Sequence, residues 1–217
     1  MNLLRPVVLA LALCAAASAQ LRPVQVRHIH LRKGEAGELQ FGESSVKFIE
    51  TGKRRKHSAE WKYGDIQQLV LRPDGLRIRT YDDVRRQLGR DREYDFDSMA
   101  KERVPEIYKY LRTRMDRRFV AAIAEPVDAP LWRVNAKLLE GLGGSQGAVV
   151  VGENRIVYQS ERPGEARTWD ISDIDNVSSS GPFDLTFTTF ERSASADRKS
   201  TRLNSSHSEI SRMPSSA

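Results

Sequence analysis

The sequence repeats itself once, with an offset of about 109 residues, and this repeat constrains the fold more than any other feature. The clearest match is a Trp-x-x-x-Asp-Ile motif, which occurs at residues 61–66 and again at residues 169–174. Two further stretches match in the same order: 42–48 with 152–158, and 76–81 with 185–190. A chain that repeats a block of this length is expected to fold as two units of one architecture.

Both copies carry the alternation of apolar and polar residues that is typical of strands with one buried face. Val46 and Phe48 alternate with polar neighbours in copy one, as Ile156 and Tyr158 do in copy two. The residues at 42–45 and 152–155 have the composition of tight turns that join two strands. The Gly-rich residues 141–147 predict a loop inside copy two. The sequence therefore predicts a mainly β fold.

One amphipathic helix is expected, at the end of copy one. Pro105 suits a first helical turn, where its missing N–H costs nothing. A Pro-rich stretch at 125–130 predicts a linker to copy two. Apolar residues recur at helical spacing after Pro105, and these are Ile107, Tyr108, Leu111, Met115 and Phe119.

Six or seven short strands and one helix in about 105 residues resemble the pleckstrin-homology-like (PH-like) barrel, including its bacterial and GRAM-type relatives. The resemblance rests on the Gly-x-Leu strand at 37–39, the aromatic strand that ends at Phe48, and the motif at 61–66. It implies a PH-like β-barrel with a closing helix at 20–124 and a truncated second PH-like unit at 125–196.

The repeated aromatic residues are expected in the cores of the two barrels. Trp61 and Trp169 occupy equivalent places beside the Asp-Ile pair, and Phe48 and Tyr158 end equivalent strands. The alternative for the two tryptophans is a role as ligand stackers. Burial of both indole rings would favour the core interpretation.

Residues 1–19 have the features of a signal peptide. Arg5 precedes an apolar run, and the small-x-small pattern Ala17-Ser18-Ala19 follows it. The run is shorter than the roughly 20 residues that span a bilayer. We expect cleavage after Ala19 and export to the periplasm or beyond. A membrane anchor formed by an uncleaved segment, and a lipoprotein attached through Cys14, remain alternatives.

Residues 197–217 are interpreted as a non-native, disordered tail. Their sequence, DRKSTRLNSSHSEISRMPSSA, has little apolar content and no periodicity. It resembles the in-frame translation of a sequencing adapter, and the alternative is a natural Ser-rich disordered tail. We therefore expect copy two to lack its last strand or strands and its helix.

The net charge of +6 does not predict nucleic-acid binding, because Arg5 and residues 197–217 supply half of it. The dense basic run is expected at a hairpin tip in copy one. It either contacts an anionic surface or a protein partner, or it is a solvated turn that protects the sheet from edge pairing. The run consists of Lys53, Arg54, Arg55 and Lys56.

No catalytic motif is recognisable: the chain lacks Gly-x-Ser-x-Gly, His-Glu-x-x-His and Gly-x-x-x-x-Gly-Lys. His28 and His30 lie two residues apart, but the sequence offers no set of further ligands, so no metal site and no cofactor are predicted. We predict an exported, non-catalytic binding or scaffolding protein whose ligand is unknown. The alternatives are a peripheral envelope binder of anionic lipid or glycan, and an enzyme whose active residues lie in a missing C-terminal part.

Overall fold

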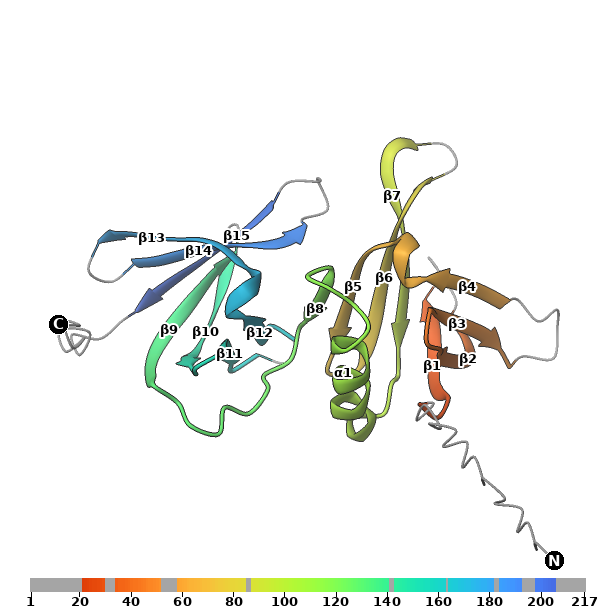
Figure 1. Ribbon diagram of the computed structural model, residues 1–217. Helices are drawn as coiled ribbons and strands as arrows, with labels where there is room; N and C mark the ends of the chain where they lie inside the picture. The colour runs from red at the N-terminus through yellow and green to blue at the C-terminus, as the bar shows by residue number, and fades with distance from the viewer. Residues whose placement is uncertain are drawn as a thin grey trace, which may run out of the picture.

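The computed structural model describes residues 21–29, 34–51, 58–84, 87–140, 143–162, 164–181, 184–192 and 198–205. Within these ranges the chain is mainly β, as predicted, with one short α-helix. All strands belong to one continuous sheet. Figure 1 shows an N-terminal half (residues 21–123) and a C-terminal half (residues 132–205), with the helix α1 and the strand β8 between them.

In the N-terminal half, strands β1 to β4 pair antiparallel in chain order, as do β5 to β7, and β7 returns to pair with β1. The helix α1 follows, and β8 then adds to β5 in parallel. The bounds are β1 (Val24–Ile29), β2 (Gly34–Phe41), β3 (Ser45–Glu50), β4 (Ser58–Lys62), the 3₁₀ helix η1 (Tyr63–Asp65), β5 (Ile66–Arg72), β6 (Gly75–Val84), β7 (Gln87–Asp97), the 3₁₀ helix η2 (Lys101–Arg103), α1 (Val104–Arg112) and β8 (Phe119–Ala121).

The C-terminal half follows the same order of pairing. Strands β9 to β12 pair in chain order, as do β13 to β15, and β15 returns to pair with β9. The bounds are β9 (Trp132–Glu140), β10 (Gly143–Val151), β11 (Arg155–Ser160), β12 (Arg167–Asp170), the 3₁₀ helix η3 (Ile171–Asp173), β13 (Ile174–Gly181), β14 (Asp184–Arg192) and β15 (Arg198–Ser205).

The two halves also match in strand register. Val24 pairs with Leu39 in the N-terminal half, and Val134 pairs with Val149 in the C-terminal half. The irregularity that opens β5, after Ile66, recurs at the start of β13. Residues that occupy the same place in the two ladders are called counterparts below.

Each half has its own hydrophobic core. The N-terminal core includes Leu39 and Phe96 from the strands and Ile107 and Leu111 from α1. The C-terminal core is smaller and is formed by strand residues alone: Ala136, Leu138, Val149, Tyr158, Trp169 and Phe187. The helix thus contributes to one core and not to the other.

The predicted helix begins at Val104 and ends at Arg112, so Met115 and Phe119, which we placed on its apolar stripe, lie beyond its end. The backbone leaves the helix at Thr113 and turns at Asp116, whose carbonyl accepts the Phe119 N–H at 2.9 Å. Phe119 then begins β8, where it pairs with Leu69. Apolar spacing alone did not distinguish a continued helix from a turn followed by a short strand.

The predicted loop at 141–147 is wrong from Gly143 onward, because these residues form the first half of β10 and pair with β9. A Cβ at Gly147 would collide with the carbonyl oxygen of Gln159 on the neighbouring strand. Glycine allows a close approach of two backbones inside a sheet. The same residue type that normally indicates a loop is here a requirement of strand packing.

The expectation that residues 197–217 lack structure does not hold for residues 198–205. These residues form β15, which pairs with β14 on one side and β9 on the other. Copy two therefore has a strand in the place where we expected one to be missing. The physical reason is that strands pair through backbone N–H and C=O groups. Every residue supplies both groups except proline, which lacks the N–H, so a segment of low apolar content can still form a strand.

Candidate functional site

The predicted core aromatics lie inside the two halves. Phe48 and Trp61 belong to the N-terminal core, and the ring of Trp61 lies 4.6 Å from that of Tyr94. Tyr158 and Trp169 belong to the C-terminal core. Burial of both indoles leaves no ring face on the surface for a ligand, which argues against the stacking alternative.

His28 is also buried, against the aromatic rings of the N-terminal core. Its imidazole stacks on Phe96 with 4.9 Å between ring centroids and meets Phe48 edge-on at 5.4 Å. His30 lies outside the described residues. Within the described ranges, no group of three or more His, Cys, Asp or Glu side chains could hold a metal ion.

The basic run of Lys53, Arg54, Arg55 and Lys56 lies outside the described residues, so the structure assigns it no contacts. Its flanking strands are described. β3 and β4 pair antiparallel, and the last pair before the run joins Ile49 to Ser58. The run therefore connects the paired ends of two strands at one edge of the sheet, where β4 is the terminal strand.

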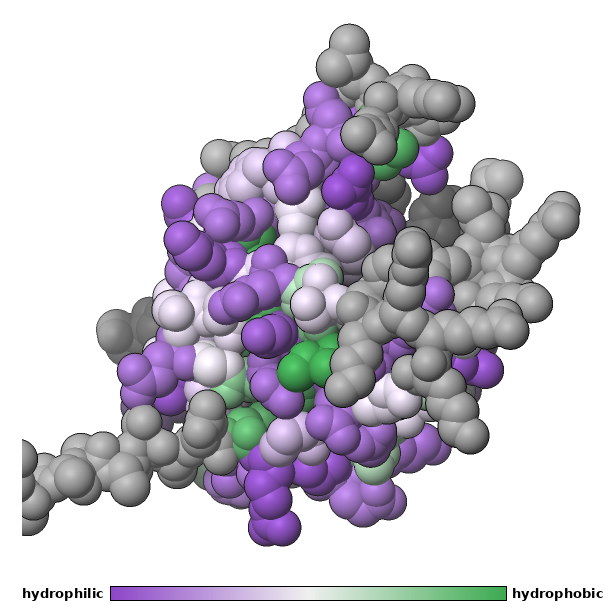
Figure 2. All heavy atoms as spheres, turned by 90° about the vertical axis from the view of Figure 1, so that its right-hand side faces the viewer, coloured by the Kyte–Doolittle hydropathy of each residue, from purple (hydrophilic) through white to green (hydrophobic). Residues whose placement is uncertain are grey.

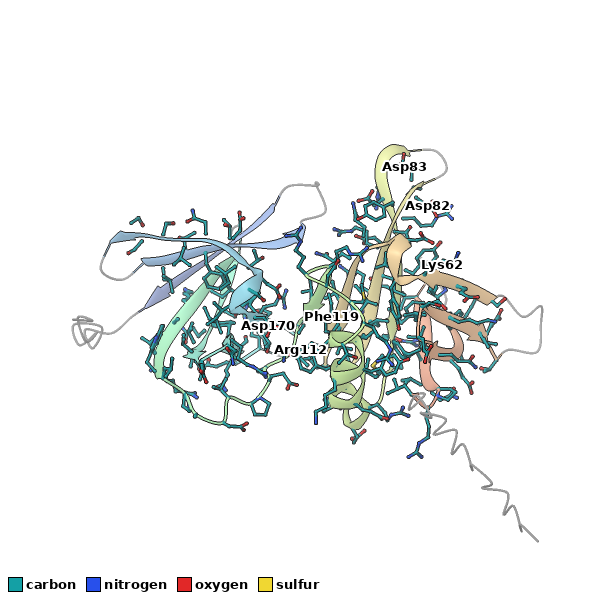
Figure 3. The ribbon with its side chains drawn as sticks, viewed as in Figure 1. Lys62, Asp82, Asp83, Arg112, Phe119 and Asp170 are labelled. Carbon is teal, nitrogen blue, oxygen red and sulfur yellow. The ribbon has the colours of Figure 1, made fainter. Side chains whose placement is uncertain are left out.

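Within the described part of the chain, a cleft lies at the junction of the two halves. Its volume is about 170 Å³. The N-terminal half contributes side chains from α1 and β8, and the C-terminal half contributes side chains from β12 and η3 (Figure 3). The residues that line it include Tyr108, Arg112, Phe119, Thr168, Asp170 and Asp173.

An ion pair crosses this junction cleft. Arg112 Nη2 lies 2.7 Å from Asp170 Oδ1, so the last residue of α1 is tied to the last residue of β12. Arg112 Nη1 also donates a hydrogen bond of 3.4 Å to the hydroxyl of Tyr108, one helical turn earlier. Both charged side chains are partly buried, which reduces the screening of their attraction by solvent.

Thr168 forms a second link across the junction. Its Oγ1 donates to the carbonyl oxygen of Ile123 at 2.8 Å and accepts from the backbone N–H of Glu125 at 3.0 Å. The side chain is buried. A buried hydroxyl that both donates and accepts fixes two backbone groups, and the loss of either bond would leave a polar group unsatisfied.

The strand β8 joins the two halves through the backbone. On one side it pairs with β5, where the Leu69 N–H donates to Arg118 O at 3.0 Å and the Ala122 N–H donates to Leu71 O at 2.8 Å. On the other side Ala121 pairs with Thr168 of β12. One sheet therefore runs from one half into the other without interruption.

The carboxyl of Asp173 lies in the cleft and interacts with several charged groups there. Burial raises the pKa of this carboxyl, and the negative charge of Asp170 raises it further, while Arg112 and Arg117 act in the opposite direction. Burial also raises the pKa of the Tyr108 hydroxyl. The cleft thus places a carboxyl with a raised pKa beside an ion pair that joins the two halves.

Sequence reasoning did not find this cleft. Arg112 falls on the polar side of the predicted helix, and Asp173 belongs to the repeated motif at 169–174, so neither position indicated a cleft. The cleft depends on the pairing of β8 with β5 on one side and with β12 on the other, and each pairing brings together segments about 50 residues apart. The nearest signal was the pair of acids in the Asp170–Asp173 stretch, which copy one does not share.

The outer face of the N-terminal half shows no broad apolar area among its described residues. Figure 2 shows a mostly hydrophilic surface with small apolar areas between charged side chains. None of the helices in the described ranges combines the length and the apolarity needed to cross a bilayer.

No protein-family model and no curated protein matches the sequence. Among solved structures, the C-terminal domain of an unknown protein from Leishmania infantum is similar with a TM-score of 0.35 and 10% identity, over 44% of this chain and 82% of that one. The Spt16D Pob3N heterodimer is similar with a TM-score of 0.31 and 13% identity, over 77% of this chain and 87% of that one. These scores are too low to carry an argument about fold or function.

Proposed function

We propose that the chain consists of two copies of a PH-like unit and acts as an exported, non-catalytic binding or scaffolding protein. The matching strand order and register of the two halves support the repeat. Export is inferred from residues 1–19, which lie outside the described ranges.

The observation that carries the scaffolding proposal is the uninterrupted sheet through β8. Two units joined by a flexible linker would move independently, since interfaces between domains are usually small and polar. Here the backbone pairing of β8, the Arg112–Asp170 ion pair and the Thr168 hydrogen bonds act together. A protein built in this way holds surfaces on its two halves at a fixed spacing, which is what a scaffold requires.

The test is to loosen the junction and measure the shape of the molecule. The double variant Thr168→Val with Arg112→Ala removes the side-chain links across the junction and replaces no residue of either core. We expect its maximum dimension in small-angle X-ray scattering to increase, with unchanged far-UV circular dichroism. Thr80→Val, a buried threonine within the N-terminal half, is the matched control. An unchanged dimension in the double variant would contradict the proposal.

A second candidate function is supported by the position of the basic run. Lys53, Arg54, Arg55 and Lys56 connect the paired ends of β3 and β4 at an edge of the sheet. Clustered basic residues at such a place are suited to contact an anionic lipid or glycan surface. This would make the protein a peripheral envelope binder.

A further inference from the structure

Apolar residues at one end of the C-terminal half are exposed although their counterparts are buried. Val177 of β13 is 56% exposed, whereas its counterpart Leu69 is fully buried. Ile171 of η3 is 44% exposed, whereas its counterpart Tyr63 is buried. The two halves therefore differ in what covers this end and not in the kind of residue that forms it.

Four neighbouring residues show the same difference to a smaller degree. Each is partly exposed, and each has a counterpart in the N-terminal half that is no more than 1% exposed. The four residues are Val151, Ile156, Ile174 and Leu185, and their counterparts are Phe41, Val46, Ile66 and Leu76. Together with Ile171 and Val177 they are called the open end.

In the N-terminal half, α1 and β8 cover the matching positions. Tyr110 of α1 lies over Phe41, with 6.3 Å between the rings, and its hydroxyl donates to the Phe41 carbonyl at 3.1 Å. Phe119 of β8 pairs with Leu69. In the described part of the C-terminal half there is no α-helix, and no strand lies beyond β13, which is the terminal strand of the sheet.

The acidic side chain of Asp173 makes the open end complementary to a basic group. In the N-terminal half, Arg118 follows α1 and donates to the carbonyl oxygens of Gly64 and Ile66 at 3.2 and 2.9 Å. The counterparts of those carbonyls lie on either side of the partly buried Asp173. Asp173 also lines the junction cleft, so the open end continues directly from the interface that α1 and β8 already form.

We propose that the open end binds an amphipathic helix of a partner protein, with a basic residue after the helix and an extended segment that pairs in parallel with β13. The apolar face of the helix would cover Ile171 and the four partly exposed residues. The extended segment would pair with β13 at Val177, as β8 pairs with β5 at Leu69. The inference rests on the strand register, the difference in burial between counterparts and the position of Asp173, and it goes beyond the proposed scaffolding role.

The probe is a fluorescent peptide with the sequence of residues 101–124, which contains α1 and β8, added to the full chain. We expect saturable binding with one peptide per chain. Val177→Lys and Ile171→Lys should each weaken it by roughly tenfold or more, because a charge would face the apolar side of the helix. Both residues are exposed, so neither variant should disturb folding.

Tyr81→Lys is the matched control, because Tyr81 is also 56% exposed but lies in the N-terminal half, and its affinity should not change. A peptide with Ile107→Asp should not bind. The proposal is overturned if the peptide fails to saturate, or if Val177→Lys binds it as well as the unchanged chain. It is also overturned if the chain dimerises and Val177→Lys makes it monomeric, because the occupant would then be a second copy.

Discussion

The two halves of the molecule share a strand order and a register, yet among the described residues a helix closes the N-terminal half and none closes the C-terminal half. Leu69 and Val177 occupy the same place in the two ladders, but the first is fully buried and the second is mostly exposed. Backbone pairing therefore sets where each residue lies, and the element added after the last strand decides how much apolar surface is buried. Similar strands can thus have different stabilities.

The largest effect is expected from truncation of these two counterparts. Leu69→Ala should lower the free energy of unfolding by about 2–5 kcal/mol, because it leaves a cavity under α1 and β8. Val177→Ala should change it by about 0.5 kcal/mol or less, as is usual for exposed side chains. Urea unfolding followed by circular dichroism measures both.

Similar losses for Leu69→Ala and Val177→Ala would mean that the open end is covered in solution. Addition of the 101–124 peptide offers an internal check of the same point. If the peptide binds as proposed, it should increase the cost of Val177→Ala and leave the cost of Leu69→Ala unchanged.

A second comparison concerns two glycines that are counterparts in β2 and β10. A Cβ at Gly37 would collide with the Phe48 ring, and a Cβ at Gly147 would collide with the Gln159 carbonyl oxygen. Gly37→Ala and Gly147→Ala should each destabilise the protein by about 1–3 kcal/mol, as overpacking does. Gly64→Ala is the control, because nothing lies within 4 Å of its Cβ position. Thermal unfolding that does not separate Gly147→Ala from Gly64→Ala would contradict this expectation.

The strands of both halves could be predicted where apolar and polar residues alternate, as around Val46 and Ile156. Prediction failed where another requirement outweighed that pattern. Residues 143–147 resemble a loop, but close packing of two backbones selects glycine at Gly147. β8 has only three residues, too few to show a period. The junction cleft could not be predicted, because it depends on the pairing of β8 with β5 and with β12, which are distant from β8 in the sequence.

A smaller effect is expected from pH at the junction. Burial raises the pKa of Asp173, so the folded protein holds this proton more tightly than the unfolded chain does. The stabilising contribution is therefore complete below the ordinary aspartate pKa of about 4 and is lost as pH rises through the higher folded pKa. Asp170, Arg112, Arg117 and Asp116 act on the same carboxyl.

Asp173→Asn should consequently raise the unfolding midpoint at pH 7 and have less effect at pH 4. Its exposed counterpart Asp65 provides the comparator, since Asp65→Asn removes a charge without a buried site. Thermal unfolding across this pH range is the measurement. A lower midpoint for Asp173→Asn at pH 7 would show that the carboxylate is stabilising, contrary to the direction given by burial.

The weakest effect is expected at the β3–β4 connection, where the halves differ in charge. Lys53, Arg54, Arg55 and Lys56 are basic, whereas the β11–β12 connection at 161–165 carries no net positive charge. Each basic residue near an anionic membrane contributes about 1 kcal/mol, so the four together support binding only in the roughly millimolar range. Because the Debye length at physiological salt is about 8 Å, this binding should decrease as salt increases.

Replacement of all four basic residues by Ser should abolish sedimentation with anionic vesicles and leave unfolding unchanged. Arg162→Ser in the β11–β12 connection should alter neither. Vesicle binding that survives the fourfold replacement, or that is absent at low salt, would identify the run as a solvated turn.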